Sequence, residues 1–77
     1  MRYILIFSNT HNALSCEKVL LSNEIEIEVL PTPSYISNSC GISIGIQEKN
    51  IDLIKKLMND ELIFVKLIYD KTNKINL

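Results

Sequence analysis

The sequence predicts an α+β fold, a ferredoxin-like βαββαβ two-layer sandwich in which two helices cover one face of a four-stranded antiparallel sheet. Three observations indicate this class. The chain of 77 residues is long enough for one domain. Four segments have the alternating or continuously apolar pattern of strands, and two have the apolar period of helices. Their order along the chain is strand, helix, strand, strand, helix, strand.

The first strand and the first helix have the clearest patterns. Residues 3–7 are continuously apolar and rich in isoleucine and aromatic residues, which is typical of a central strand. Ser8, Asn9 and Thr10 follow, and each is a good helix N-cap. A helix is therefore expected over residues 11–22, with a buried stripe made of Ala13, Cys16 and Leu20.

The middle of the chain supplies two strands. In residues 24–29 glutamates alternate with apolar residues, so we expect one buried face and one solvated face rather than paired catalytic carboxylates. Pro31 and Pro33 have no N–H to donate to a sheet, so the strand is expected to end there and an ordered loop to begin. Residues 41–47 form the next strand, with three isoleucines on one face and small residues on the other.

The last third of the chain supplies a helix and a strand. The helix starts at residues 48–50 and has an apolar face made of Ile51, Ile54, Leu57 and Met58. The last strand is expected over residues 62–68. Residues 1–70 then form a single domain, and residues 71–77 form a tail that we expect to fray. Because the first and last strands are apolar on both sides, we expect a homodimer through the sheet face that the helices leave open.

Composition and motifs exclude several classes of function. The net charge is −1 and Arg2 is the only arginine, so the chain lacks the basic patch of a nucleic-acid-binding protein. No apolar run approaches the ~20 residues that cross a bilayer, so no membrane partner is expected. We expect a cytoplasmic protein with free thiols. Without a CxxC pair, metal-ligand spacing or a glycine-rich phosphate loop, we expect no metal and no cofactor.

The predicted topology brings Cys40 close to the start of the first helix. The loop that carries it lies at the same end of the sheet as residues 8–11. A helix N-terminus has a partial positive charge and favours a thiolate. Cys40 is therefore a candidate nucleophilic and accessible thiol. Six neighbours are expected to support it as hydrogen-bonding groups or by leaving room for a partner: Thr10, His11, Ser37, Asn38, Ser39 and Gly41.

Each of these residues also has an ordinary structural interpretation. A single loop cysteine is usually unreactive, a histidine in a first helical turn is usually solvated, and serine and asparagine are common in turns. We interpret Cys16 as a small core residue. A Cys16–Cys40 disulfide is not expected, because Cys16 lies about 9 Å along the helix axis from Thr10.

Two stretches resemble a known family. One is Ser-Asn-Thr-His-Asn-Ala-Leu at residues 8–14, followed by Glu17, and the other is residues 31–41, from Pro-Thr-Pro to Ile-Ser-Asn-Ser-Cys-Gly. Up to about Tyr69 the chain is similar to small bacterial domains described as selenium/sulfur (Se/S) carrier protein-like. The Cys-Gly loop is the most specific part of this resemblance.

The resemblance implies that Cys40 would hold the sulfur or selenium atom. Thr10, His11, Ser37 and Gly41 match the surroundings of that cysteine in the family. Ser34 is a departure, since the family often has an arginine at this position. If that arginine orients an anionic substrate or stabilises the thiolate, this chain lacks its contribution.

Three functions stay open at this point. The first is a thiol-based sulfur or selenium carrier, a sulfur relay in which Cys40 holds the atom as a persulfide or selenyl-sulfide between donor and acceptor proteins. The second is a regulatory module that binds a small ligand or anion with the helix start and the polar loop. The third is a dimerising accessory domain that works through the open sheet face. All three favour a carrier or binding domain over a classical enzyme.

Overall fold

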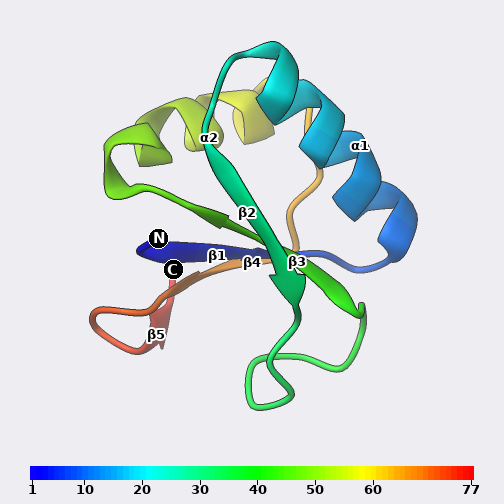
Figure 1. Ribbon diagram of the computed structural model, residues 1–77, viewed down its shortest axis with the longest axis vertical. Helices are drawn as coiled ribbons and strands as arrows, with labels where there is room; N and C mark the ends of the chain where they lie inside the picture. The colour runs from blue at the N-terminus through cyan, green and yellow to red at the C-terminus, as the bar shows by residue number, and fades with distance from the viewer.

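The computed structural model covers residues 1–77 and has two helices and five strands. The elements in chain order are β1 (Tyr3–Ile6), α1 (Thr10–Ser22), β2 (Ile27–Pro31), β3 (Ile42–Ile46), the 3₁₀ turn η1 (Glu48–Asn50), α2 (Ile51–Asn59), β4 (Leu67–Asp70) and β5 (Ile75–Asn76). The strands form one sheet in the order β2-β3-β1-β4-β5, and every neighbouring pair is antiparallel (Figure 1). The predicted α+β class with two helices on an antiparallel sheet is confirmed.

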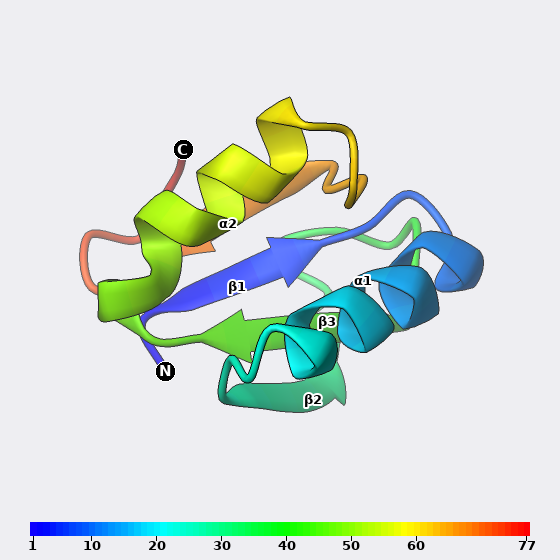
Figure 2. The same ribbon diagram turned by 90° about the horizontal axis from the view of Figure 1, so that it is seen from above.

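Both helices lie on one face of the sheet, and the main core fills the space between the two layers (Figure 2). The register puts Leu5 opposite Ile44 on one side and opposite Ile68 on the other, so three strands contribute to one row of side chains. All three are buried in the core cluster. Each such aliphatic side chain stabilises the fold by about 1.5–3 kcal/mol relative to an exposed one.

Helix α1 follows the prediction closely. Its N-cap is Asn9, whose side-chain oxygen accepts a hydrogen bond of 2.8 Å from the backbone N–H of Asn12. Its buried residues are the predicted Ala13, Cys16 and Leu20. Glu24 ends the helix by adopting φ 57°, and the Ile25 N–H returns to the Leu20 carbonyl oxygen at 3.0 Å.

Strand β2 begins three residues later than expected and includes Pro31. The delay follows from Glu24, which belongs to the helix end in a left-handed conformation and so is not part of a strand. Pro31 is tolerated because β2 is an edge strand, paired only with β3, where Pro31 lies opposite Ile42. The outward side chains of Glu26 and Glu28 are exposed, as the alternation predicts.

The predicted last strand at residues 62–68 is wrong in its bounds, because β4 runs from Leu67 to Asp70. Glu61 ends α2 with φ 59°, and the chain then needs several residues to cross from the helix layer to the sheet. Ile63 is buried in the core on the way. Sheet pairing starts only where the Lys66 N–H donates to the Ile6 carbonyl oxygen at 2.7 Å.

The sheet has five strands rather than the predicted four, because the C-terminal segment supplies β5. The turn between β4 and β5 is closed by Asp70, which accepts from the backbone N–H groups of Thr72 at 2.9 Å and Asn73 at 3.3 Å. Lys74 adopts φ 56° just before β5. All of residues 71–77 are exposed, and their fraying in solution stays a prediction.

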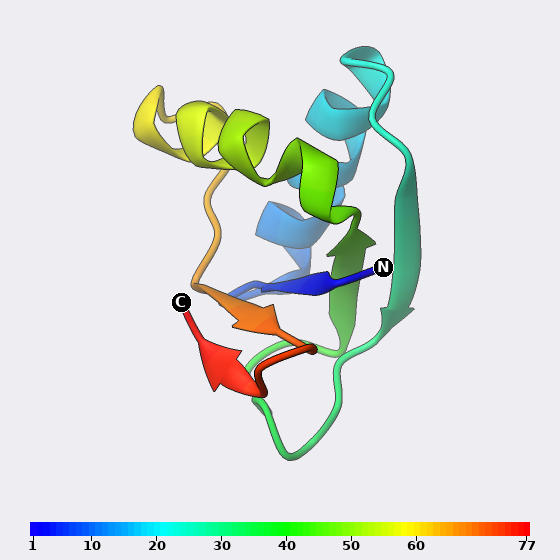
Figure 3. The ribbon, with the colours of Figure 1, turned by 90° about the vertical axis from the view of Figure 1, so that its left-hand side faces the viewer.

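The β2–β3 loop, residues 32–41, lies on the side of the sheet away from the helices (Figures 1 and 3). Tyr35 of the loop makes an edge-on contact with Tyr69 of β4, at 6.1 Å between ring centroids. On this side Ile4 and Ile6 of β1 are only 3% and 0% exposed. Much of the apolar surface that suggested a homodimer is therefore covered within the chain, and the homodimer stays a prediction. Neither helix is long and apolar enough to cross a membrane.

Candidate functional site

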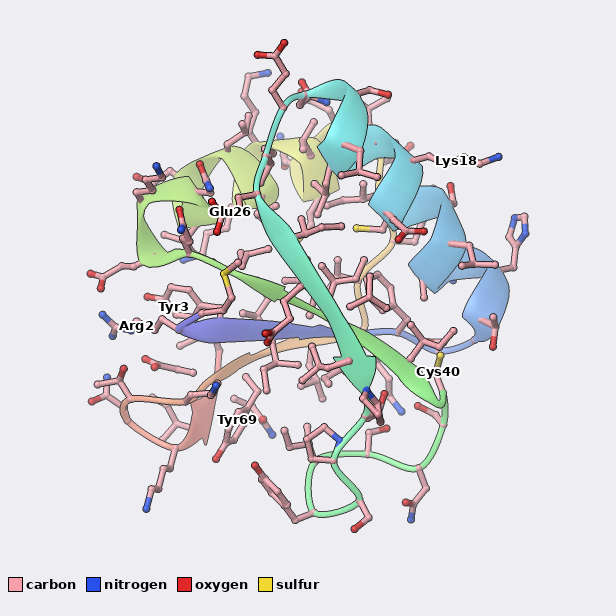
Figure 4. The ribbon with its side chains drawn as sticks, viewed as in Figure 1. Arg2, Tyr3, Lys18, Glu26, Cys40 and Tyr69 are labelled. Carbon is pink, nitrogen blue, oxygen red and sulfur yellow. The ribbon has the colours of Figure 1, made fainter.

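Cys40 lies directly before β3, at the end of the sheet where β1 ends and α1 begins (Figure 4). The neighbouring Ser39 hydroxyl donates a hydrogen bond of 3.2 Å to the carbonyl oxygen of Phe7, the first residue after β1. This contact joins residues 32 positions apart in the chain. The topological prediction that the Cys40 loop meets the end of the first strand is therefore confirmed.

The Cys40 side chain is buried, contrary to the expectation of an accessible thiol. It is 6% exposed and belongs to the main core cluster. Its sulfur donates a hydrogen bond to the Ile42 carbonyl oxygen at 3.4 Å. In this contact the group is a thiol rather than a thiolate, since only S–H can donate to a carbonyl. The side chain turns inward because Cys40, two residues before β3, has the same parity as Ile42, Ile44 and Ile46, which pack into the same core.

Two of the six predicted supporting residues form a hydrogen-bonded cluster beside Cys40. The hydroxyl oxygens of Ser37 and Ser39 lie 2.8 Å apart, and the Ser39 N–H donates to the Ser37 hydroxyl at 3.2 Å. Because the single Ser39 proton points to Phe7, the Ser37 hydroxyl is the donor in the hydroxyl pair. Neither serine bonds to the sulfur of Cys40.

The other four predicted residues, two in the loop and two at the start of α1, make no hydrogen bond to the thiol. Thr10, His11 and Asn38 are exposed, and their side chains donate to no group of the protein. At Gly41 a Cβ atom would have no atom within 4 Å, so this backbone borders open solvent. The site is therefore polar at its surface, with the sulfur beneath it.

Lys66 is the site residue that the sequence analysis missed. Its ammonium donates to the Ser39 hydroxyl at 3.1 Å, so the loop is tied to the start of β4 as well as to the end of β1. Lys66 also borders a groove of about 230 Å³ whose other lining residues are Ser8, Asn12, Met58, Ile63, Phe64 and Val65. The antiparallel pairing of β1 and β4 is the signal that could have found it, had the start of β4 been placed correctly.

Cys16 has the environment of an inert core thiol, as predicted. It is fully buried in α1, and burial raises its pKa to about 12. Both cysteines are free, so the expectation of no disulfide is confirmed. Of the two thiols only Cys40 lies next to a surface loop.

The most strongly perturbed charges lie at the opposite end of β1. Arg2 forms a two-pronged ion pair with Asp70, with distances of 3.2 and 3.0 Å, and a second ion pair of 2.9 Å with Glu48. The hydrogen bonds from Arg2 lower the pKa of Asp70 to about 2. Figure 4 shows Arg2 and Cys40 at opposite ends of the strand. We interpret this cluster as a structural clamp. No group of three or more His, Cys, Asp or Glu residues is arranged to hold a metal ion.

A comparison with known families identifies the family of this chain. Residues 2–70 match the family described as "Putative Se/S carrier protein-like". The chain belongs to this family. The matched range includes Cys40, the serine cluster and Lys66 and ends at Asp70, so the family domain is the fold without β5. No curated protein matches the chain, and no solved structure matches it.

Proposed function

We propose that the protein is a thiol-based sulfur or selenium carrier in which Cys40 transiently holds the transferred atom. The observation that carries this proposal is the family match over residues 2–70, which includes the Cys40 loop. The position of that loop at the end of β1, with a lysine and two serines beside it, supports the assignment. Donor and acceptor are other proteins of the cytoplasm, where thiols stay reduced.

The transfer step is a thiol exchange that needs no oxidant. The Cys40 thiolate attacks the terminal sulfur of a donor persulfide, the donor S–S bond breaks, and a new S–S bond forms on Cys40. The donor leaves as a thiolate, and the proton that Cys40 gave up goes to solvent. Delivery repeats the step with the acceptor thiolate attacking the Cys40 persulfide. A selenium atom would be held in the same way, as a selenyl-sulfide.

The surroundings of Cys40 are suited to an anionic intermediate. A persulfide carries a negative charge near neutral pH, and Lys66 is a cation that makes no ion pair in the protein. The first turn of α1 contains no acidic residue, so the partial positive charge of the helix start is not offset.

The test is to incubate the reduced protein with a persulfide donor and to weigh its peptides by mass spectrometry. We expect the mass of one sulfur atom to be added to the peptide that contains Cys40 and none to the peptide that contains Cys16. A Cys40→Ser variant should lose the gain, and a Cys16→Ala variant should keep it. Loading on Cys16, or no loading on either thiol, would contradict the carrier function.

We also propose that the fold is a ferredoxin-like arrangement to which β5 is added. The chain order β1-α1-β2-β3-α2-β4 and the sheet order β2-β3-β1-β4 support this assignment. A homodimer through the open sheet face is a further part of the proposal. Its support is reduced to the half-buried apolar side chains left around the loop, mainly those of Leu30, Leu67 and Tyr69. The molar mass in solution tests it.

A further inference from the structure

The buried state of Cys40 conflicts with any exchange reaction unless the loop moves. Thiol exchange requires the attacking sulfur to approach the sulfur of its partner directly. In the structure the residue Cys40 is 6% exposed, and its thiol donates a hydrogen bond to the Ile42 carbonyl oxygen. A partner protein has no path to a sulfur in this position. The structure is therefore the closed state of the site.

Three of the hydrogen bonds next to Cys40 share one hydroxyl group, that of Ser39. Ser39 Oγ donates to the Phe7 carbonyl oxygen at 3.2 Å and accepts from Lys66 Nζ at 3.1 Å. It also lies 2.8 Å from Ser37 Oγ, so its proton and both lone pairs are used. We call the hydrogen bonds to Phe7 and Lys66 the Ser39 anchor. It connects the residue before Cys40 to the end of β1 and to the start of β4.

The loop is built so that the segment around Cys40 can separate while its ends stay in place. At its base the Thr32 N–H donates to the Gly41 carbonyl oxygen at 3.1 Å, next to the Thr32–Ser43 hydroxyl contact. At its tip the Ile36 N–H donates to the Pro33 carbonyl oxygen at 3.0 Å, and Tyr35 contacts Tyr69. Between these fixed points the segment makes side-chain hydrogen bonds to other elements only through the Ser39 anchor and through the Cys40 thiol, which donates to the Ile42 carbonyl oxygen. Both Ser39 and Lys66 are exposed, so water or a ligand can replace either partner.

We infer that the Ser39 anchor controls access to Cys40, and that sulfur exchange proceeds from a locally opened loop in which Ser39 has left Phe7 and Lys66. The functional role of this loop opening rests on the proposed carrier function. Opening breaks the two anchor bonds and takes Cys40 out of the core cluster while the rest of the domain stays folded, so it is a local fluctuation below the global unfolding energy. An anionic group of a partner that attracts Lys66 removes one of the two anchor bonds.

The experiment measures the rate of iodoacetamide alkylation at each cysteine of the native chain, read by peptide mass spectrometry at neutral pH. The variants are Ser39→Ala and Lys66→Met. The matched control is Lys55→Met, because Lys55 is exposed on α2 and makes no hydrogen bond or ion pair. Cys16 serves as an internal control, since it is 0% exposed and becomes reactive only when the domain unfolds.

We expect Ser39→Ala to raise the rate of Cys40 alkylation about tenfold, which corresponds to a decrease of about 1.4 kcal/mol in the free energy that favours the closed loop over the open one. Lys66→Met should raise it severalfold, and the double variant should not exceed Ser39→Ala, because both changes act on the same hydroxyl. Lys55→Met and all Cys16 rates should be unchanged. The inference is overturned if Cys40 rates are equal in all variants, or if Cys16 reacts in step with Cys40 and the opening is therefore global.

This assay contains no sulfur donor, so it separates the two proposals. If the carrier function is wrong and the inference about the Ser39 anchor is right, Cys40 is alkylated faster in Ser39→Ala but gains no sulfur from a persulfide donor. If the inference about the Ser39 anchor is wrong and the carrier function is right, Cys40 gains sulfur from the donor at the same rate in all variants.

Discussion

The environment of Cys16 leads to a specific dependence of stability on pH. Cys16 is 0% exposed, and burial raises its pKa from 9.0 to about 12. In the unfolded chain the thiol ionises above pH 9.0, whereas in the folded chain it stays protonated until about pH 12. The folded state therefore loses stability relative to the unfolded state as the pH rises through this window, and the effect is absent below it.

The size of the effect follows from the two pKa values. At pH 10, one unit above the unfolded pKa, the loss is about 1.4 kcal/mol. A Cys16→Ala variant cannot show this loss. It should be about 1 kcal/mol less stable than the natural protein at pH 7, because it leaves a small space in the core. Near pH 10 the two proteins should have nearly equal free energies of unfolding.

The measurement is urea unfolding of both proteins at pH 7 and pH 10, followed by circular dichroism in the presence of a reducing phosphine. All other residues are the same in both proteins, so the difference between the two free energies isolates Cys16. The reasoning is refuted if that difference is the same at both pH values. Such a result would mean that Cys16 ionises in the folded protein as readily as in the unfolded chain.

Two further predictions concern the ends of the strands and the helix. Asp70→Asn should reduce thermal stability at pH 7. The difference in stability from the natural protein should shrink as the pH falls from about 4 to 2, because the stability that Asp70 contributes is lost when its carboxylate is protonated at its pKa of about 2. A difference at pH 3 equal to that at pH 7 would contradict this prediction. Asn9→Ala should destabilise the protein by about 1 kcal/mol in urea unfolding, since it removes the N-cap bond to Asn12, whereas Ser8→Ala should have little effect; equal losses in both variants would show that the cap is not the cause.

The parts of the fold that the sequence predicted are those fixed by short-range pattern. Helix α1 needs only the spacing of Ala13, Cys16 and Leu20 and a cap residue before Thr10, and all of these are local. The meeting of the Cys40 loop with the end of β1 was also predictable, since it depends on strand order and direction alone. A family resemblance carried by residues 31–41 then pointed to the same loop.

The parts that were missed depend on contacts between distant residues. Residues 62–68 are apolar on both parities, so their pattern could not show that Ile63 packs into the core before the strand begins at Leu67. The hydrogen bonds that tie the Cys40 loop to the end of β1 and to the start of β4 join Ser39 to Phe7 and Lys66, which lie far from it in the chain. The position of a side chain in a loop is set by such contacts, and they are visible only in three dimensions.

The two outer strands of the sheet limit how copies of this protein can associate. β2 ends in Pro31, which has no N–H to offer, and the charged side chains of Glu28 in β2 and of Glu26 just before it are exposed to solvent. The opposite edge is β5, which is only two residues long. Both edges therefore discourage a continuous ladder with a strand from another molecule. These edges favour association of copies through the faces of the sheet over pairing of their strands.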